Sequence, residues 1–199
     1  MDSYRAVFSA LPTLHTERLT LRKLNIRDAR DVYAYASDTE VARHVLWTAH
    51  KSISESRAYI RAARHQYRVG LPATFAIELT KEHRVIGTIG FTWVNTDHQS
   101  AEVGYSLARA YWNQGLTTEA LKAVLNFAFD ALALNRVEAM HETDNPASGR
   151  VMQKAGMREE GILRERVRNK GQYRDVRLWS ILRQDWCKQN TTQGDKSHV

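Results

Sequence analysis

The stretch "AYWNQGLTTEALKAVLNFAF", residues Ala110 to Phe129, decides how the rest of the chain is interpreted. Its second half predicts an amphipathic helix, because apolar residues recur at helical spacing: Leu121, Val124, Leu125, Ala128 and then Leu132. The entry to this helix is unusual, because no acidic residue occurs between Ser106 and Thr118. Exposed amides and the helix dipole attract negative charge to a helix start, so we expect a ligand to supply that charge here.

The residues around Gly115 suit a phosphate cradle. Glycine lets the backbone approach a ligand closely, Thr117 and Thr118 offer hydroxyl donors, and Arg109 adds positive charge. The common nucleotide-binding loops are absent, since the sequence contains neither GxxxxGK[ST] nor GxGxxG. The alternative is an ordinary threonine-capped helix with a glycine in its loop, and this motif alone leaves both interpretations open.

Bulk composition indicates one ordinary soluble domain, with 199 residues of which 43% are hydrophobic and 26% charged. No apolar run is long enough to span a bilayer, and no signal peptide is evident, so we expect no membrane partner. The single Cys187 excludes an internal disulfide and a cysteine zinc cluster. We expect a cytoplasmic protein with one domain over residues 1–187 and a polar, flexible tail over residues 188–199.

The net charge of +7 raises the question of nucleic-acid binding. Basic residues are scattered along the chain, however, and acidic residues interrupt the densest patch, Arg164 to Arg177. No zinc-finger spacing or basic-leucine heptad is present, so we expect no nucleic-acid partner. The patch is interpreted as a solvated basic hairpin, and an acidic partner or substrate surface is the alternative.

The order of predicted elements indicates a mixed α/β chain with a strand–helix–strand crossover. Alternation and turn signals predict strands over 17–24, 73–79, 84–94, 100–107, 136–142, 157–168 and 173–182. Helical spacing and capping residues predict helices over 25–38, 52–70, the segment after Gly115, and 146–156. No repeat or linker argues for a second domain.

Four segments, in their order and spacing, strongly resemble the GNAT acyltransferases, specifically the RimJ/RimL-type N-acetyltransferases. They are "TERLTLRKLNIRDA" (16–29), "AEVGYSLARAYWNQGLTTEAL" (101–121), "DNPASGRVMQKAGM" (144–157) and "GQYRDVRLWSIL" (171–182). The resemblance runs from about Thr16 to Trp186. It implies the GNAT fold, an α/β (α+β) architecture whose central mixed, mostly antiparallel sheet of about seven strands is flanked by helices.

The resemblance also implies acetyl-CoA as cosubstrate. The family's pyrophosphate loop, Q/R-x-x-G-x-G/A, aligns with Trp112, Gly115 and Thr117, so its first and last places depart from the general pattern. The implied cofactor contacts in and beside this loop are Asn113, Gln114, Gly115, Leu116, Thr117 and Thr118. The pantetheine arm is expected where strand 100–107 splays from strand 136–142, with backbone contacts around Leu107. Asn145 and Ser148 match an N-x-x-S element near the thioester.

Two residues are predicted to carry the chemistry. Glu102 is the candidate base, because it alternates with Ala101 and Val103 and so faces away from those apolar residues. Its alternative role is a surface or salt-bridging carboxylate. Ser148 is the candidate acid for the departing sulfur, because the tyrosine that many family members place seven residues after the asparagine is Met152 here. Ser148 and Asn145 have an alternative role in capping the helix that begins near Pro146.

Other residues receive weaker assignments. His141 is interpreted mainly as a packed or exposed histidine and secondarily as a base, while Tyr111 and Trp112 are expected to pack in the core or loop. Tyr173 and Asp175 either line the amine-binding mouth or form a cross-strand pair. The eight histidines show no metal-ligand spacing, so no metal is predicted.

The resemblance points to direct acetyl transfer to a primary amine, first of all the N-terminal α-amine of a protein of the ribosomal type. A small amine, such as an amino acid, polyamine or antibiotic, is the alternative acceptor. A non-catalytic acyl-CoA-binding module is the alternative class. A homodimer is implied by the family alone.

Overall fold

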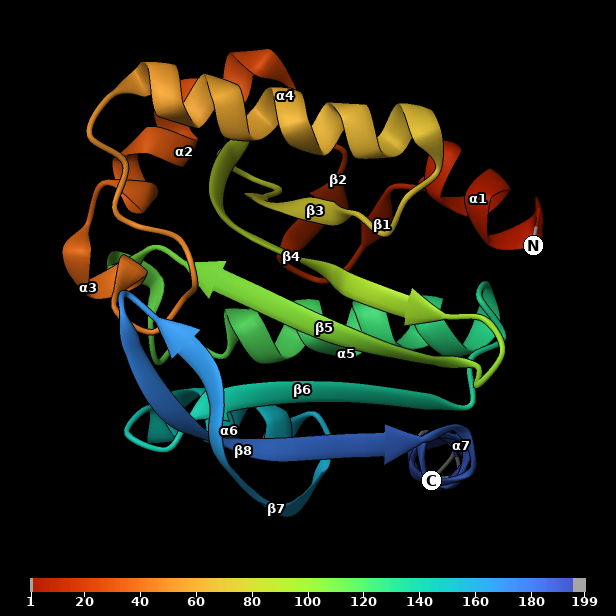
Figure 1. Ribbon diagram of the computed structural model, residues 1–199. Helices are drawn as coiled ribbons and strands as arrows, with labels where there is room; N and C mark the ends of the chain where they lie inside the picture. The colour runs from red at the N-terminus through yellow and green to blue at the C-terminus, as the bar shows by residue number, and fades with distance from the viewer. Residues whose placement is uncertain (1, 195–199) are drawn as a thin grey trace.

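The computed structural model describes residues 2–194 of the chain and shows a single open sheet of eight strands with helices packed on it (Figure 1). The strand order is β1-β2-β3-β4-β5-β6-β8-β7. The bounds are β1 Leu14–His15, β2 Leu19–Arg22, β3 Thr74–Leu79, β4 Arg84–Asn95, β5 Ser100–Leu107, β6 Arg136–Glu142, β7 Arg158–Asn169 and β8 Gln172–Leu182. Only β5 and β6 pair in parallel, which confirms the predicted mixed, mostly antiparallel sheet.

The eighth strand is the two-residue β1, which the sequence pattern did not predict. It is too short to show alternation, and it exists because Leu14 and His15 pair with Leu21 and Thr20 of β2.

Helices cover the sheet. Their bounds are α1 Asp2–Ser9, α2 Ala29–Ala36, α3 Thr39–Ala42, α4 Ile53–Val69, α5 Leu116–Asp130, α6 Pro146–Lys154 and α7 Arg183–Gly194, with single 3₁₀ turns at Ile26–Asp28 and Arg109–Tyr111. Helix α5 lies behind the sheet in Figure 1 and contacts β2 and β4, whereas α2 packs on β4 and α4. Among the described residues, no helix has the length and apolar character needed to cross a membrane.

Both ends of the described chain are helical, which the sequence analysis did not predict. In α1, Phe8 is buried and meets the ring of Phe91 edge-on at 5.7 Å. In α7, Trp186 packs on Phe129 and donates its indole proton to Asn126 Oδ1 at 3.1 Å. Residues 188–194, assigned to a flexible tail, continue α7, and residues 195–199 lie outside the described part of the chain.

The core lies between the sheet and its helices, and β4 runs through its centre. Seven consecutive residues of β4, Val85 to Phe91, are buried, as expected for a strand covered on both faces. At Gly90 an added Cβ would lie 2.3 Å from Thr74 Cα of the neighbouring strand, so only glycine fits this close approach. These contacts fix the sheet on which the site is built.

The strands β5 and β6 separate after three paired residues, as predicted. Residues 100–102 pair with residues 136–138, and beyond Glu102 the two strands have no common register. Opposite this point a register shift in β4 lies between Phe91 and Trp93. A bulge bends and twists a strand, so we attribute the divergence in part to this shift. The gap opens into a pocket of about 980 Å³.

Candidate active site

The pocket between the separating strands gathers residues from distant parts of the chain. Its walls are β5, the start of α5, the end of β6, the start of α6 and the segment that follows α3. Of the predicted site residues it is lined by Glu102, Leu107, Asn113, Gly115, Leu116, Thr117, Thr118, Asn145 and Ser148. Gln114 is exposed and lies between two lining residues in the sequence, but it is not itself among the lining residues. The fold therefore brings the predicted cofactor loop and both predicted catalytic residues to one cavity.

The loop that precedes α5 has the geometry of an anion cradle. Asn113 has a φ of 61° and Gly115 a φ of 78°, so two residues have the left-handed backbone that occurs in anion-binding turns. Gly115 is the N-cap of α5, and no side chain caps this helix. Among the described residues, the amides of residues 114–118 have no hydrogen-bond acceptor. A helix start in this state is suited to a phosphate group.

The acidic residue in the first turn of α5, Glu119, is turned away from this loop. Its carboxylate accepts hydrogen bonds from Thr16 Oγ1 at 2.6 Å, from the Arg18 amide at 2.9 Å and from Arg18 Nε at 2.7 Å. Burial opposes ionisation of Glu119, but these bonds outweigh it and lower the pKa. The carboxylate is thus bound to the turn before β2, and no carboxylate of this helix turn is left to bind the amides of the cradle.

The cation beside the cradle is Arg18, not the predicted Arg109. Arg18 Nη1 donates to the carbonyl of Gln114 at 3.1 Å, and its Nη2 would lie 3.6 Å from a Cβ placed on Gly115. Arg109 instead pairs with Asp38 through Nε at 2.9 Å. Arg18 lies 96 residues before the loop, so only the packing of α5 beside β2 could identify it.

Trp112 joins the loop to the end of β5. Its indole Nε1 donates to the carbonyl of Leu107 at 2.7 Å, which agrees with the predicted loop-packing role. This bond occupies one of the two lone pairs of the Leu107 carbonyl. Contact of Leu107 with pantetheine therefore stays a prediction.

Ser148 and Asn145 lie where α6 begins. The Asn145 side chain accepts from the Ser148 amide at 3.4 Å, as expected of a helix N-cap. Ser148 Oγ lies 2.8 Å from the hydroxyl of Tyr105, a β5 residue that also bonds the Ser148 carbonyl at 3.1 Å. Burial raises the pKa of Tyr105, so its hydroxyl keeps its proton at neutral pH. No spacing or motif in the sequence marks Tyr105 as a site residue.

Glu102 is half-buried and faces the pocket from the last paired position of β5. Its Oε1 accepts a hydrogen bond from Thr92 Oγ1 at 2.7 Å. Within residues 2–194 the structure shows no ion pair for Glu102, so the salt-bridge alternative is not observed. A carboxylate held this way has lone pairs left to accept a proton from a bound amine.

His141 is packed inside the protein, which was the favoured interpretation. Its Nδ1 donates a hydrogen bond to the carbonyl of Glu142 at 2.8 Å, and burial lowers the pKa of the imidazole. The other nitrogen, Nε2, has no hydrogen-bond partner among the described residues and abuts α6, where a Cβ on Gly149 would come within 2.7 Å.

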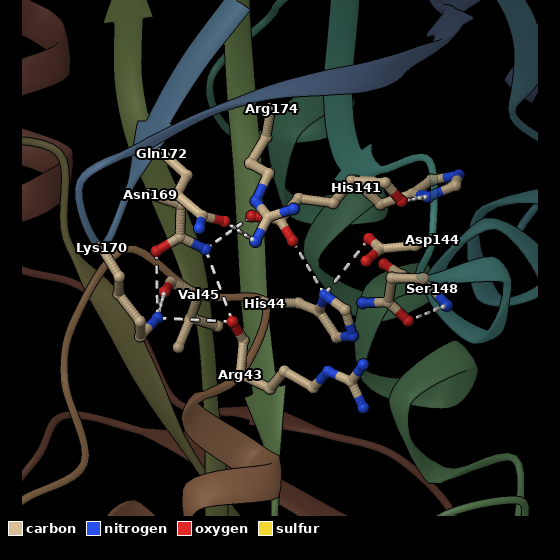
Figure 2. Close-up of polar contacts among 12 residues, drawn as sticks. Arg43, His44, Val45, His141, Asp144, Ser148, Asn169, Lys170, Gln172 and Arg174 are labelled. Atoms are coloured by element: carbon tan, nitrogen blue, oxygen red, sulfur yellow. Dashed lines mark hydrogen bonds and ion pairs between the residues drawn. The ribbon is translucent and has the colours of Figure 1, made fainter. Parts of the chain in front are cut away.

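The end of the pocket near Ser148 holds a polar network that the sequence analysis did not predict (Figure 2). His44 Nδ1 lies 2.9 Å from Glu142 Oε2 and 3.6 Å from Asp144 Oδ1. Asn169 and Lys170, from the turn of the β7–β8 hairpin, complete the network. Lys170 bonds the carbonyl of Ala42, 128 residues away, so no local spacing marks the members of this network.

Of the two roles left open for Tyr173 and Asp175, the structure shows the cross-strand one. Tyr173 is exposed beneath Arg168, and Asp175 accepts from the Glu165 amide at 2.8 Å, so these two are cross-strand contacts outside the pocket lining. Val167 and Val176 line the pocket instead.

The expected absence of a metal stays a prediction. His44, Glu142 and Asp144 form the one group among the described residues whose nitrogen and oxygen atoms lie within 4.8 Å of one another. In this group the His44 nitrogen and the Glu142 oxygen are already joined by a hydrogen bond.

Comparison with known proteins gives matches over most of the chain. A family model described as an acetyltransferase (GNAT) domain matches residues 18–158. The uncharacterized N-acetyltransferase p20 of Bacillus licheniformis is 34% identical over 177 residues, which cover 89% of this chain and 99% of p20. The ribosomal protein uS5-alanine N-acetyltransferase of Escherichia coli is 25% identical over 87% of this chain and 92% of its own length.

A solved structure shares the architecture. RimJ of Mycobacterium smegmatis, in complex with CoA-disulfide, superimposes with a TM-score of 0.77 at 26% identity and covers 87% of this chain and 88% of its own.

Proposed function

This chain belongs to the GNAT family of acetyl-CoA-dependent N-acetyltransferases, and we propose that its acceptor is the N-terminal α-amine of a protein. The observation that carries the proposal is a single pocket that joins the uncapped amides of α5 to Glu102 and Ser148. The distant relatives named for ribosomal proteins support this class of acceptor.

The pocket suits acetyl-CoA along its whole length. The diphosphate would be held by the amides of residues 114–118, with Arg18 supplying positive charge beside Gly115. The pantetheine arm would lie along the edge of β5 that β6 leaves unpaired after Glu102. This path ends beside Asn145 and Ser148 at the start of α6.

Glu102 is proposed as the base at the thioester end of the pocket. An α-amino group has a reference pKa of about 7.7–8.0, whereas that of a lysine side chain is about 10.4, so an N-terminal acceptor needs less assistance. The carboxylate would receive a proton from the nitrogen as the new C–N bond forms. Direct transfer needs no protein nucleophile, and the exposed Cys187 lies in α7, away from the pocket lining.

The Tyr105–Ser148 pair is proposed to protonate the departing sulfur. Ser148→Ala and Tyr105→Phe are each expected to lower kcat by about tenfold, a modest loss because a thiolate is already a good leaving group. The double variant should lose little more than either single variant, since the two hydroxyls act through one hydrogen bond. Steady-state kinetics of the three variants checks this. Additive losses would show that the hydroxyls do not act as a pair.

The choice of acceptor is tested by following thiol release from acetyl-CoA with two sets of amines. Peptides that begin with Ala or Ser are expected to have higher kcat/KM values than amino acids, polyamines and aminoglycosides. The same peptides with a blocked N-terminus should be inactive and serve as the control. Activity on small amines alone would replace the proposed acceptor, and CoA binding without any turnover would favour a non-catalytic binding module.

A further inference from the structure

His44 is a histidine in the wall of the active-site pocket, and one of its ring nitrogens is held by a carboxylate. It follows α3, its side chain is 20% exposed, and it lines the pocket. The 2.9 Å bond joins its Nδ1 to Glu142, whose carboxylate can only accept, so Nδ1 carries the proton. In the neutral imidazole Nε2 then bears a free lone pair, and the structure shows no hydrogen bond to it among the described residues. The tautomer is thus the one that accepts protons from a substrate.

The carboxylate that orients His44 is itself held in place. Glu142 is buried, and its second oxygen, Oε1, accepts a hydrogen bond from Asn169 Nδ2 at 2.5 Å. A buried carboxylate with both oxygens bonded does not rotate freely, so the imidazole keeps one orientation.

Lys170 holds the segment that carries His44. Its Nζ donates to the carbonyls of Ala42 at 2.9 Å and Val45 at 2.8 Å, and to the Asn169 side chain at 3.0 Å. In Figure 2, His44 lies between these hairpin residues and the side of the pocket marked by Asp144 and Ser148. Three separate parts of the chain therefore converge to fix one imidazole.

The chemistry of acetyl transfer leaves a task for such a group. An amine that arrives as an ammonium ion loses two protons from its nitrogen, one before attack and one as the C–N bond forms and the C–S bond breaks. Glu102, as proposed above, receives the second. The first N–H bond breaks with its electron pair staying on nitrogen, so another acceptor is needed for that proton.

We propose that the Nε2 atom of His44, oriented by Glu142, removes the first proton from the acceptor's ammonium group. The proton passes from nitrogen to imidazole, the Glu142 carboxylate stabilises the imidazolium, and the proton then leaves to water through the open pocket. This inference rests on the proposed function, because it concerns the same amine. It makes His44 a catalytic residue and Glu142, Asn169 and Lys170 positioning residues.

Other charged groups surround the part of the pocket that His44 lines. Asp144 is the nearest, at 3.6 Å from Nδ1. The other charged or titratable groups in this part of the molecule line the same pocket (Glu40, Arg43, His141, Glu142, Arg150 and Lys154) or bond the backbone beside His44 (Lys170). Acids and bases are both present, so the removal of one exposed charge is not expected to abolish the role of His44.

The test compares His44→Gln with the wild type by the pH dependence of kcat/KM for an Ala-starting peptide. At pH 7 only about a tenth to a sixth of the α-amine is neutral, so the variant is expected to lose up to about tenfold. By pH 9.5 the amine is already neutral in solution, so the two proteins should converge. A purely structural role would give the same loss at every pH. A pH-independent loss, or full activity at pH 7, would overturn the proposal.

Glu142→Gln provides a second, sharper test. The amide oxygen would take the place of Oε1 beside Asn169, which leaves the amide NH₂ facing His44 Nδ1. That nitrogen must then accept, and the imidazole proton moves to Nε2, so this variant should reproduce the loss at pH 7. Asp144→Asn is the matched control, because its carboxylate is 55% exposed and lies beyond hydrogen-bond distance. It should keep the shape of the wild-type pH profile.

Heteronuclear NMR of the imidazole nitrogens gives a readout that does not depend on activity. The wild type should show the proton of His44 on Nδ1 and Glu142→Gln should show it on Nε2, and the opposite result in the wild type would overturn the proposal. Thermal melting checks that each variant is folded. Loss of wild-type activity on addition of a chelator would show that this group binds a cation, and would overturn the role of His44 as proton acceptor. If small amines prove to be the acceptors, the same pH series is run with them. The choice of acceptor is then tested by substrate preference and the role of His44 by the pH profile, so the two proposals can fail separately.

Discussion

Gly115→Asp is expected to weaken acetyl-CoA binding by about 30-fold or more. A like charge about 4 Å from the diphosphate costs up to about 4 kcal/mol near a protein surface, and each 1.4 kcal/mol is a factor of about ten in affinity. The new carboxylate would also attract Arg18, the cation beside the cradle. The loss should appear in the dissociation constant measured by calorimetry with CoA, and again in the KM for acetyl-CoA.

Gly115→Asn is the matched control for this prediction. Asparagine and aspartate have the same shape and both tolerate the left-handed backbone better than other residues, so both variants keep a φ near 78° at similar strain. A Cβ at this position meets only Arg18 Nη2 at 3.6 Å, an ordinary contact. Asparagine should therefore bind CoA much better than aspartate. Equal affinities of the two variants would show that the diphosphate does not lie at this helix start.

Glu102→Gln is expected to lower kcat by about 100-fold or more, the range of a lost general base. Glutamine keeps an oxygen to accept the hydrogen bond from Thr92, so the local structure should survive. Binding of acetyl-CoA should be unchanged. The loss should also persist at pH 9.5, because it concerns the proton released during bond formation, whereas the His44→Gln loss should fade there.

The matched control for Glu102 lies directly across the sheet. Glu138 of β6 is paired in register with Glu102, but Arg136 binds its carboxylate at 2.6 Å and it does not line the pocket. Glu138→Gln should leave kcat near the wild-type value. If Glu102→Gln acetylates amines at the wild-type rate while still binding CoA, the base has been assigned wrongly.

The elements were largely predictable because each is encoded by its own spacing of apolar residues. Strands 100–107 and 136–142 have the predicted bounds, and the helix that begins after Gly115 ends at Asp130. The separation of these strands and the capping role of Asn145 were also foreseen. Strand β1 and helices α1 and α7 were missed, since two residues are too few for a pattern and the two helices depend on single buried aromatics such as Phe8 and Trp186.

The assignment of charges in the site was less predictable. Arg109 follows the correct strand but pairs with Asp38, while Arg18 comes from the other side of α5. A charged side chain reaches several ångströms in any direction, so position in the sequence does not identify its partner. The same limit applies to Tyr173 and Asp175, which were correctly placed on the hairpin and still lie outside the pocket lining.

The sequence by itself determined the parts that depend on neighbours along the chain: the uncapped start of α5, the turn at Gly115 and the strand–helix–strand crossover around it. Tertiary structure alone decided the pairs that complete the site. Tyr105 meets Ser148 across 43 residues, His44 meets Glu142 across 98 and Arg18 meets Glu119 across 101. Periodicity reports which face of an element is apolar, but the order of strands in the sheet determines which faces meet.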